Sequence, residues 1–225
     1  MDTSRHGGHG GVPPEFERIG PLRSILALVA ALLLSACNEK GGSLMPTPPA
    51  STWVFQFSPN MPKTPTPNGS GEVFFDFPSV DGVHYLVRGH SSPLSGTMSM
   101  QIEVISTGNP TFVSGDPKST ACPTPAAATL YFQRVGDRGT AKYKFYRWFA
   151  SERYEIKPGI GTYSVPLTVD RWGSVFAEQD AGQFAAALAS PMAIGATFGK
   201  GCFAGHGIYV TGGAVRMYIR SFTVQ

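Results

Sequence analysis

The stretch Met98-Ser99-Met100-Gln101-Ile102-Glu103-Val104 decides the fold class. Its apolar residues alternate strictly with polar ones, and this period of two places the apolar side chains on one face of a β-strand. The same alternation returns in the run Val215–Arg220 near the end of the chain. A strand with one buried and one solvated face is typical of antiparallel sheets, so we expect an antiparallel sheet here.

Other short apolar and aromatic runs extend this pattern along the chain. They are Trp53–Phe57, Glu72–Phe77, Val83–Arg88, Leu130–Arg134 and Lys142–Phe149, the last two joined by a turn at Gly136–Gly139. Turn-forming residues separate the runs, and no strand–helix–strand unit is visible. The pattern therefore predicts an all-β chain, folded as an antiparallel β-sandwich.

One short helix is expected near residues 181–190. Asp180 and Gln183 have the spacing of a capping box, and an Ala-rich run follows them. Phe184 and Leu188 are four residues apart and share one face of a helix, so we expect that face to pack against the sheets.

The composition excludes two classes of protein. The 225 residues include 15 Phe and 8 Tyr, and 42% of them are hydrophobic, which is enough to form a core and excludes disorder throughout the chain. The 18 Lys and Arg exceed the 15 Asp and Glu by only three, so the chain lacks the basic field that duplex nucleic acid requires. We expect no nucleic-acid partner.

The N-terminal region has the features of an export signal. Ser24–Leu34 is an apolar run too short to span a bilayer, and Arg18 and Arg23 precede it. The run ends in Leu34-Ser35-Ala36-Cys37, which resembles the lipobox of bacterial lipoproteins. The resemblance implies that residues 1–36 are a signal peptide and that Cys37 carries acyl chains such as palmitate, which anchor the protein to a membrane. The alternative is an ordinary cleaved signal in which Cys37 is incidental.

The lipoprotein interpretation divides the chain and places it in the cell. Residues 37–52, rich in Gly, Pro and Ser, are expected to form a lipidated cysteine and a flexible tether, and residues 53–225 the sandwich domain. Asn38 follows the cysteine where an Asp would signal retention in the inner membrane. We therefore expect a bacterial envelope protein, with the outer membrane favoured.

Two further cysteines, Cys122 and Cys202, form an even pair in an exported domain and predict a disulfide. The alternative, a catalytic thiol beside His206, lacks a third residue that would orient the pair. The glycine-rich run Gly199–Gly207 lacks the ending of a phosphate-binding loop and leads into a strand, so a tight turn explains it better.

Three segments together resemble the galactose-binding-domain-like jelly rolls, a family that includes many carbohydrate-binding modules. They are Lys144–Phe149, Gly161–Trp172 and Ile194–Val224. The family also includes domains that bind proteins or lipids, so the resemblance implies the fold more directly than the ligand.

Aromatic and cationic side chains are the candidate ligand-binding residues, because sugar rings stack on aromatic faces while polar groups bond their hydroxyls. The candidates are Tyr146, Arg147, Trp148, Arg171, Trp172 and His206. Strand alternation puts Tyr146 and Trp148 on one face and Arg147 on the other, and the sequence leaves open which face is core. The polar residues of Val215–Arg220 form either part of a binding surface or a solvated face.

Acidic residues cluster twice without a recognisable catalytic setting. Asp170, Glu178 and Asp180 form one group, and Glu152 and Glu155 the other. They suggest weakly a glycoside hydrolase or a structural calcium site, and no zinc constellation of His and Cys is visible. We therefore expect no cofactor and a non-catalytic envelope lipoprotein that binds a glycan. The alternative is a structural or assembly lipoprotein that contacts another envelope protein.

Overall fold

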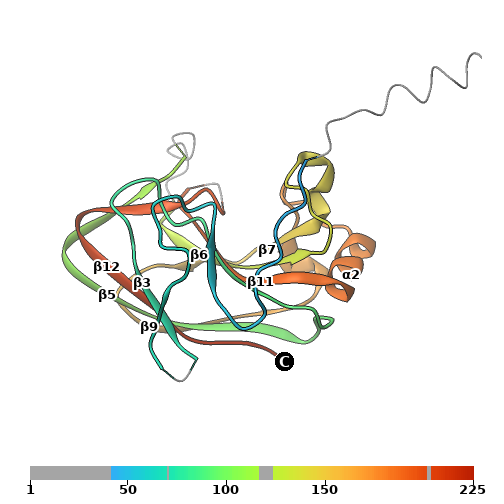
Figure 1. Cartoon of the computed structure of the whole chain (residues 1–225), viewed down its shortest axis with the longest axis horizontal. Coiled ribbons are helices and arrows are strands. Elements are labelled where there is room, and N and C mark those ends of the chain that lie inside the picture. Colours follow the sequence, from blue (N-terminus) through green and yellow to red (C-terminus); the bar gives the residue numbers. More distant parts are fainter. Residues whose placement is uncertain (1–41, 70, 117–123, 202–203) are drawn as a thin grey trace, which may run out of the picture. The chain divides into compact units, whose positions relative to one another are not determined.

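The computed structural model describes residues 42–69, 71–116, 124–201 and 204–225, and about half of them lie in two antiparallel sheets, here called sheet A and sheet B (Figure 1). The strands of sheet A are β1 (Val54–Gln56), β4 (Tyr85–Gly89), β6 (Ala127–Arg134), β7 (Arg147–Ala150), β8 (Tyr154–Glu155), β10 (Trp172–Gly173) and β11 (Pro191–Gly199). Those of sheet B are β2 (Thr66–Pro67), β3 (Val73–Asp76), β5 (Thr97–Ser114), β9 (Gly159–Pro166) and β12 (Ile208–Val224). The described helices are α2 (Ala181–Ala189) and two 3₁₀ segments, η2 (Ala141–Tyr146) and η3 (Val169–Arg171).

The strand order confirms the predicted all-β sandwich. Sheet A runs β1-β4-β11-β6-β7-β10, with β8 also paired to β6, and sheet B runs β2-β3-β12-β5-β9. Along the sequence the chain passes repeatedly from one sheet to the other, so strands distant in sequence become neighbours. None of the helices in the described ranges is long and apolar enough to cross a membrane.

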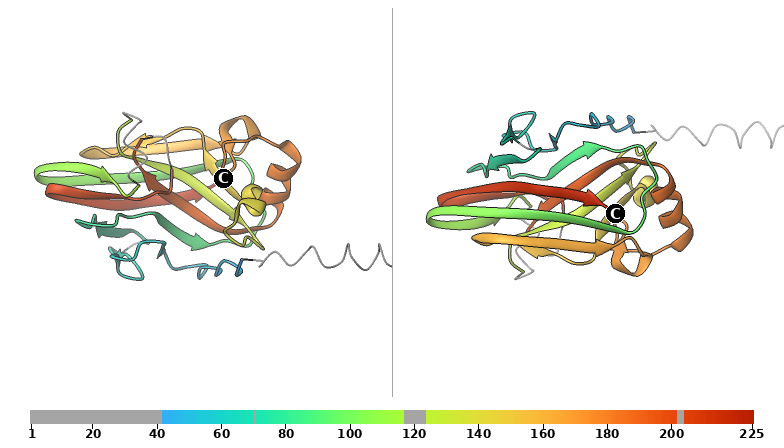
Figure 2. Two further views of the ribbon diagram at one scale, coloured as in Figure 1. Left: turned by 90° about the horizontal axis from the view of Figure 1, so that it is seen from above. Right: turned by 90° about the horizontal axis from the view of Figure 1, so that it is seen from below.

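The two alternating runs of the sequence pair at the centre of sheet B. Val104 lies opposite Met217, and Ile102 lies opposite Ile219, with all four side chains buried. Figure 2 shows the two long strands β5 and β12 side by side, in green and red. Because Met98, Met100, Ile102 and Val104 face inward together with Val215, Met217 and Ile219, the period of two predicted these faces correctly.

Sheet A is covered on both faces at its centre. Every residue of β11 is buried, although only alternate side chains, such as Ile194 and Phe198, belong to the core between the sheets. On the outer face, Ala193 packs with Val87 and Tyr131 in a second, smaller apolar cluster. The outer face of sheet A, which would be solvated in a simple sandwich, is therefore partly covered by apolar side chains. The site described below lies on this outer face.

The helix α2 forms where the sequence predicts it. The Asp180 carboxylate accepts a hydrogen bond from the Gln183 amide at 2.9 Å, which caps the N-terminus. Phe184 is buried against Trp148 and Phe132, with ring centroids 4.9 and 5.7 Å away. Leu188 is partly buried against the same core. The helix thus covers one end of the aromatic core, as its apolar spacing predicts.

The expected strand Lys142–Phe149 is only half correct. Its first part is the 3₁₀ segment η2, and only Arg147–Ala150 pairs with β6. The turn puts Phe145 and Trp148, three residues apart, on the same aromatic core, and the Trp148 indole N–H donates to the Phe145 carbonyl at 2.9 Å. A continuous strand would point these two side chains to opposite faces, so tertiary packing overrides the strand pattern.

The tether expected over residues 37–52 differs from the structure in its described part. The Pro49 carbonyl accepts from the Gly89 amide at 2.9 Å, and the Met45 amide donates to the Asp137 carbonyl at 2.9 Å. Pro48 is buried, and a Cβ at Gly89 would lie 2.2 Å from the Pro48 oxygen. Residues 42–52 therefore pack along sheet A. The predicted signal peptide and Cys37 lie outside the described residues.

Candidate functional site

A cavity of about 460 Å³ opens on the outer face of sheet A. Its walls come from β4, β7, β10 and the loops that follow β7, β10 and β11. The lining residues are His84, Tyr85, Arg147, Phe149, Ala150, Ser151, Arg153, Gly173, Ser174, Val175, Ala177, Ala204, Gly205 and His206. The volume lies in the range of pockets that hold small ligands.

Aromatic rings form one wall of the cavity. Tyr131, which is almost fully buried, contacts Tyr85 and Phe149 edge-on or tilted, with ring centroids 5.2 Å away in each case. Burial raises the pKa of Tyr85 to about 12 and that of Tyr131 well above its ordinary value. Both phenols stay protonated and neutral near pH 7, so this wall is apolar with hydroxyl groups attached.

Arg147 projects from β7 toward the cavity and is held by a buried carboxylate. Its Nε lies 3.0 Å from Asp137 Oδ2, and its Nη2 donates to the Thr140 carbonyl at 3.3 Å. Asp137 also accepts from the Gln133 amide group at 2.8 Å and from the Gly139 backbone amide at 2.9 Å. The Nε proton makes no well-aligned hydrogen bond, so charge attraction holds the pair. The guanidinium is therefore fixed before any ligand arrives.

Two histidines complete the polar side of the cavity. The His84 ring nitrogens lie 3.1 Å from the carbonyl oxygens of Gly205 and Asp81, which holds the ring in one orientation. His206 Nδ1 lies 2.9 Å from Asp116 Oδ2. Gly205 has φ +77°, and a Cβ there would lie 2.4 Å from the Tyr85 hydroxyl, so only glycine lets this loop approach the aromatic wall.

The structure brings together two of the six predicted ligand-binding residues. Arg147 and His206 both line the cavity although they lie far apart in the sequence. Trp148 and Trp172 are fully buried in the core, where Trp172 donates its indole N–H to the Pro166 carbonyl at 2.8 Å. Neither tryptophan can contact a ligand in this fold, so this part of the predicted site is wrong.

The other two candidates lie away from the cavity. Tyr146 is partly buried, with the Arg134 guanidinium 4.9 Å from its ring centroid and Tyr143 packed against it. Arg171 is paired with Glu152. Both have structural contacts that account for them.

Sequence reasoning missed the cavity residues Tyr85, Phe149, Ser151 and Arg153. Tyr85 lies two residues before buried Val87 and shares its face of β4. This spacing is ordinary for a packed strand and does not mark a cavity. Arg153 and Ser151 follow β7 in a short loop without a motif. No sequence signal marks these residues, because the cavity is assembled from separate segments.

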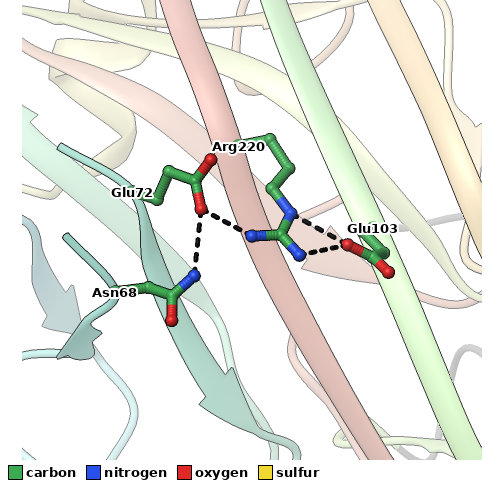
Figure 3. Close-up of polar contacts among 4 residues, drawn as sticks. All are labelled: Asn68, Glu72, Glu103 and Arg220. Atoms are coloured by element: carbon green, nitrogen blue, oxygen red, sulfur yellow. Dashed lines mark hydrogen bonds and ion pairs between the residues drawn. The ribbon is translucent and has the colours of Figure 1, made fainter. Parts of the chain in front are cut away.

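The outer face of sheet B carries a ladder of charged side chains (Figure 3). Arg220 donates to Glu103 and to Glu72, and Asn68 donates to Glu72 at 3.0 Å. Arg216 makes two hydrogen bonds to Asp76, at 2.7 and 2.8 Å. These pairs join β3, β12 and β5 across the sheet, so the arginines of β12 have structural partners.

The Asp76–Arg216 pair makes stability depend on pH. Hydrogen bonds from Arg216 lower the pKa of Asp76 below its ordinary value. A carboxylate with a depressed folded-state pKa stabilises the fold above the unfolded pKa of about 4, and this contribution disappears as the pH falls through the folded pKa. Asp76→Asn should therefore lower the free energy of unfolding at pH 7 by less than about 1 kcal/mol, because the pair is exposed.

Denaturant unfolding of both proteins at pH 7 and at about pH 3 tests this expectation. The difference between wild type and Asp76→Asn should shrink at the lower pH, because protonated Asp76 no longer pairs with Arg216. A difference that is the same at both pH values would contradict the assignment.

The acidic groups of the sequence have individual structural roles. Glu178 pairs with Lys144 at 2.7 Å, Asp180 caps α2, and Glu152 pairs with Arg171. Among the residues that the structure describes, no three His, Cys, Asp or Glu side chains are grouped to hold a metal ion.

Cys122 and Cys202 lie outside the described residues, so their disulfide stays a prediction. Their described neighbours are in contact: the Thr124 hydroxyl donates to the Gly201 carbonyl at 2.6 Å, and the Gly201 amide donates to the Thr124 carbonyl at 3.4 Å. Peptide mapping under non-reducing conditions would find the bridged peptides, and two free thiols would exclude the bridge.

The cavity therefore combines an aromatic wall, a fixed guanidinium and two oriented histidines. Such a mixture of apolar surface and a few convergent polar groups is typical of small-ligand sites. In comparisons with known proteins, the chain matches no protein-family model, no curated protein and no solved structure.

Proposed function

We propose that this protein is a lipid-anchored component of the bacterial cell envelope whose β-sandwich binds a glycan without catalysis. The anchor rests on Leu34-Ser35-Ala36-Cys37 at the end of an apolar run preceded by arginines. Two or three acyl chains hold a protein at a membrane stably, since each buried methylene contributes about 0.8 kcal/mol. The membrane is then the first partner, and the outer membrane is favoured because Asn38 follows the cysteine.

The cavity on sheet A is the observation that carries the ligand proposal. Tyr85 and Phe149 offer ring surface for the C–H face of a sugar, while Arg147 and His206 offer donors for its hydroxyl groups. Arg147 is held by Asp137, so the cavity does not have to rearrange on binding.

A second candidate function is attachment to another envelope protein. Ile105 and Ile160 are 45% and 67% exposed on neighbouring strands of sheet B. Two exposed apolar side chains beside a charged ladder offer a surface for a protein contact, although isolated exposed apolar residues are also ordinary. A stoichiometric partner recovered by crosslinking, and lost in Ile160→Asp, would favour this function over glycan binding.

Lipidation is tested in the full chain. Cells expressing the protein are labelled with an alkyne analogue of palmitate, and the Cys37→Ala variant is the control. Label in the wild type and none in the variant supports the anchor. Equal labelling, or none in either, overturns it.

Glycan binding is tested with the detergent-solubilised full chain on a panel of glycans and peptidoglycan fragments. We expect saturable binding that weakens at least about fivefold, or about 1 kcal/mol, in His206→Ala, with the exposed residue Lys157 changed to Ala as the control. Circular dichroism shows whether each variant is folded. No binding to any member overturns the glycan proposal, and release of product from a bound glycan would make the protein a hydrolase.

A further inference from the structure

The cavity on sheet A is lined by cationic and imidazole side chains. Arg147 and Arg153 reach it from β7 and from the loop after β7, and His84 and His206 lie on its other side. Among the described lining residues there is no Asp or Glu. The lining therefore offers guanidinium N–H donors to a ligand with negative charge, and no lining carboxylate opposes it.

Carboxylates next to the lining residues limit how much negative charge the ligand can carry. Arg147 is paired with buried Asp137, and His206 with Asp116. Arg153 donates from Nη1 to the Gly201 carbonyl at 2.5 Å, which holds it beside the loop that carries Gly205 and His206. Because the carboxylates of Asp137 and Asp116 match the two arginines in formal charge when the histidines are neutral, the cavity suits a ligand with a single negative charge better than one with two.

We propose that the cavity binds the carboxylate of an acidic sugar residue, such as a uronic acid, with Arg153 and Arg147 on the carboxylate and Tyr85 and Phe149 against the ring. This proposal rests on the glycan-binding function and names its ligand class. A planar guanidinium matches a carboxylate with two parallel hydrogen bonds. A single negative charge also matches the lining better than the nearly double charge of a phosphate monoester.

The presence of ring surface beside the charge supports a sugar over a free anion. Apolar groups, including Ala150, Val175 and Ala177, line the cavity together with the aromatic wall. A small inorganic anion would leave this surface in contact with water, whereas a sugar ring would cover it. The acidic group then orients the sugar in the cavity, and the sugar ring buries the apolar surface of the lining.

Calorimetric titration of the full chain with three ligands tests the proposal: a glucuronic-acid disaccharide, the matching neutral glucose disaccharide and glucose 6-phosphate. We expect the acidic disaccharide to bind at least about tenfold more tightly than the other two, and less tightly at high salt. Arg153→Gln should weaken its binding about tenfold, whereas Lys157→Gln, an exposed cation outside the cavity, should change it less than about twofold. Arg153 is chosen because it is exposed and its replacement spares the Arg147–Asp137 pair.

Each other outcome overturns a distinct statement. Equal binding of acidic and neutral disaccharides would overturn the acidic-sugar proposal and leave glycan binding standing. Tighter binding of glucose 6-phosphate would overturn the choice of carboxylate over phosphate. No change in Arg153→Gln would place the carboxylate elsewhere. Absence of binding by all three, together with a negative glycan panel, would overturn the proposed function itself.

Discussion

Trp148→Ala should lower the free energy of unfolding by about 3–5 kcal/mol, the usual cost of removing a large aromatic side chain from a core. Trp148 is fully buried, and its ring packs against Phe184 at 4.9 Å and Phe132 at 6.4 Å. Its indole N–H also satisfies the Phe145 carbonyl. Truncation removes these contacts together and leaves a cavity between the two sheets.

Denaturant unfolding measures this effect, and Trp148→Phe is the matched control. The Phe variant keeps most of the ring contacts and should lose clearly less stability than the Ala variant. At temperatures where Trp148→Ala is still folded, it should bind ligand like the wild type, since the side chain does not reach the cavity. A stable Trp148→Ala protein that has lost binding would show that Trp148 belongs to the site.

Arg147→Met should cost about 3 kcal/mol, the lower end for breaking a buried ion pair. The change leaves the Asp137 carboxylate, which is 1% exposed, without its countercharge, although Gln133 and the Gly139 amide still donate to it. The arginine side chain keeps 16% exposure, so the expected cost is not at the upper end. The methionine fills a similar volume, which separates the charge effect from packing.

The double variant Arg147→Met/Asp137→Asn provides the decisive comparison. The neutral amide that replaces the Asp137 carboxylate can still accept a hydrogen bond through its side-chain oxygen, so we expect the double variant to recover most of the lost stability. Denaturant midpoints of the wild type, both single variants and the double variant form the cycle. A double variant as unstable as the sum of the two single variants would show that the pair has no energetic coupling.

The alternation in the sequence was enough to predict the buried faces of the two central strands of sheet B, β5 and β12, over their alternating runs. The prediction is correct for Met98–Val104 and Val215–Ile219, because the period of two in a strand depends only on neighbouring residues and every inward residue there is apolar. The helix α2 could be predicted equally well, since the Asp180 side chain and the Gln183 backbone amide that it caps lie within one turn. These features depend on neighbours a few residues away, so local sequence carries the whole signal.

The sequence could not decide which face of a strand is buried in the core when both faces carry apolar or aromatic residues. Around Trp148, both faces carry aromatic residues, and the choice depends on α2 and on Phe132, which approach from other parts of the chain. The same reason explains the half-correct strand before Arg147. Local periodicity there competes with packing against Phe184, and packing is stronger.

The sequence by itself therefore determined the alternating strands at the centre of sheet B, the helix and the sandwich class, while the N-terminal export signal stays a prediction. Only the tertiary structure decided the candidate site. The cavity brings His84, Arg147 and His206 from three distant segments, and its walls exist because the loops after β7, β10 and β11 meet over an outer face of sheet A. Periodicity reports whether a side chain faces one side of its own strand, whereas a cavity depends on what other segments place above that side.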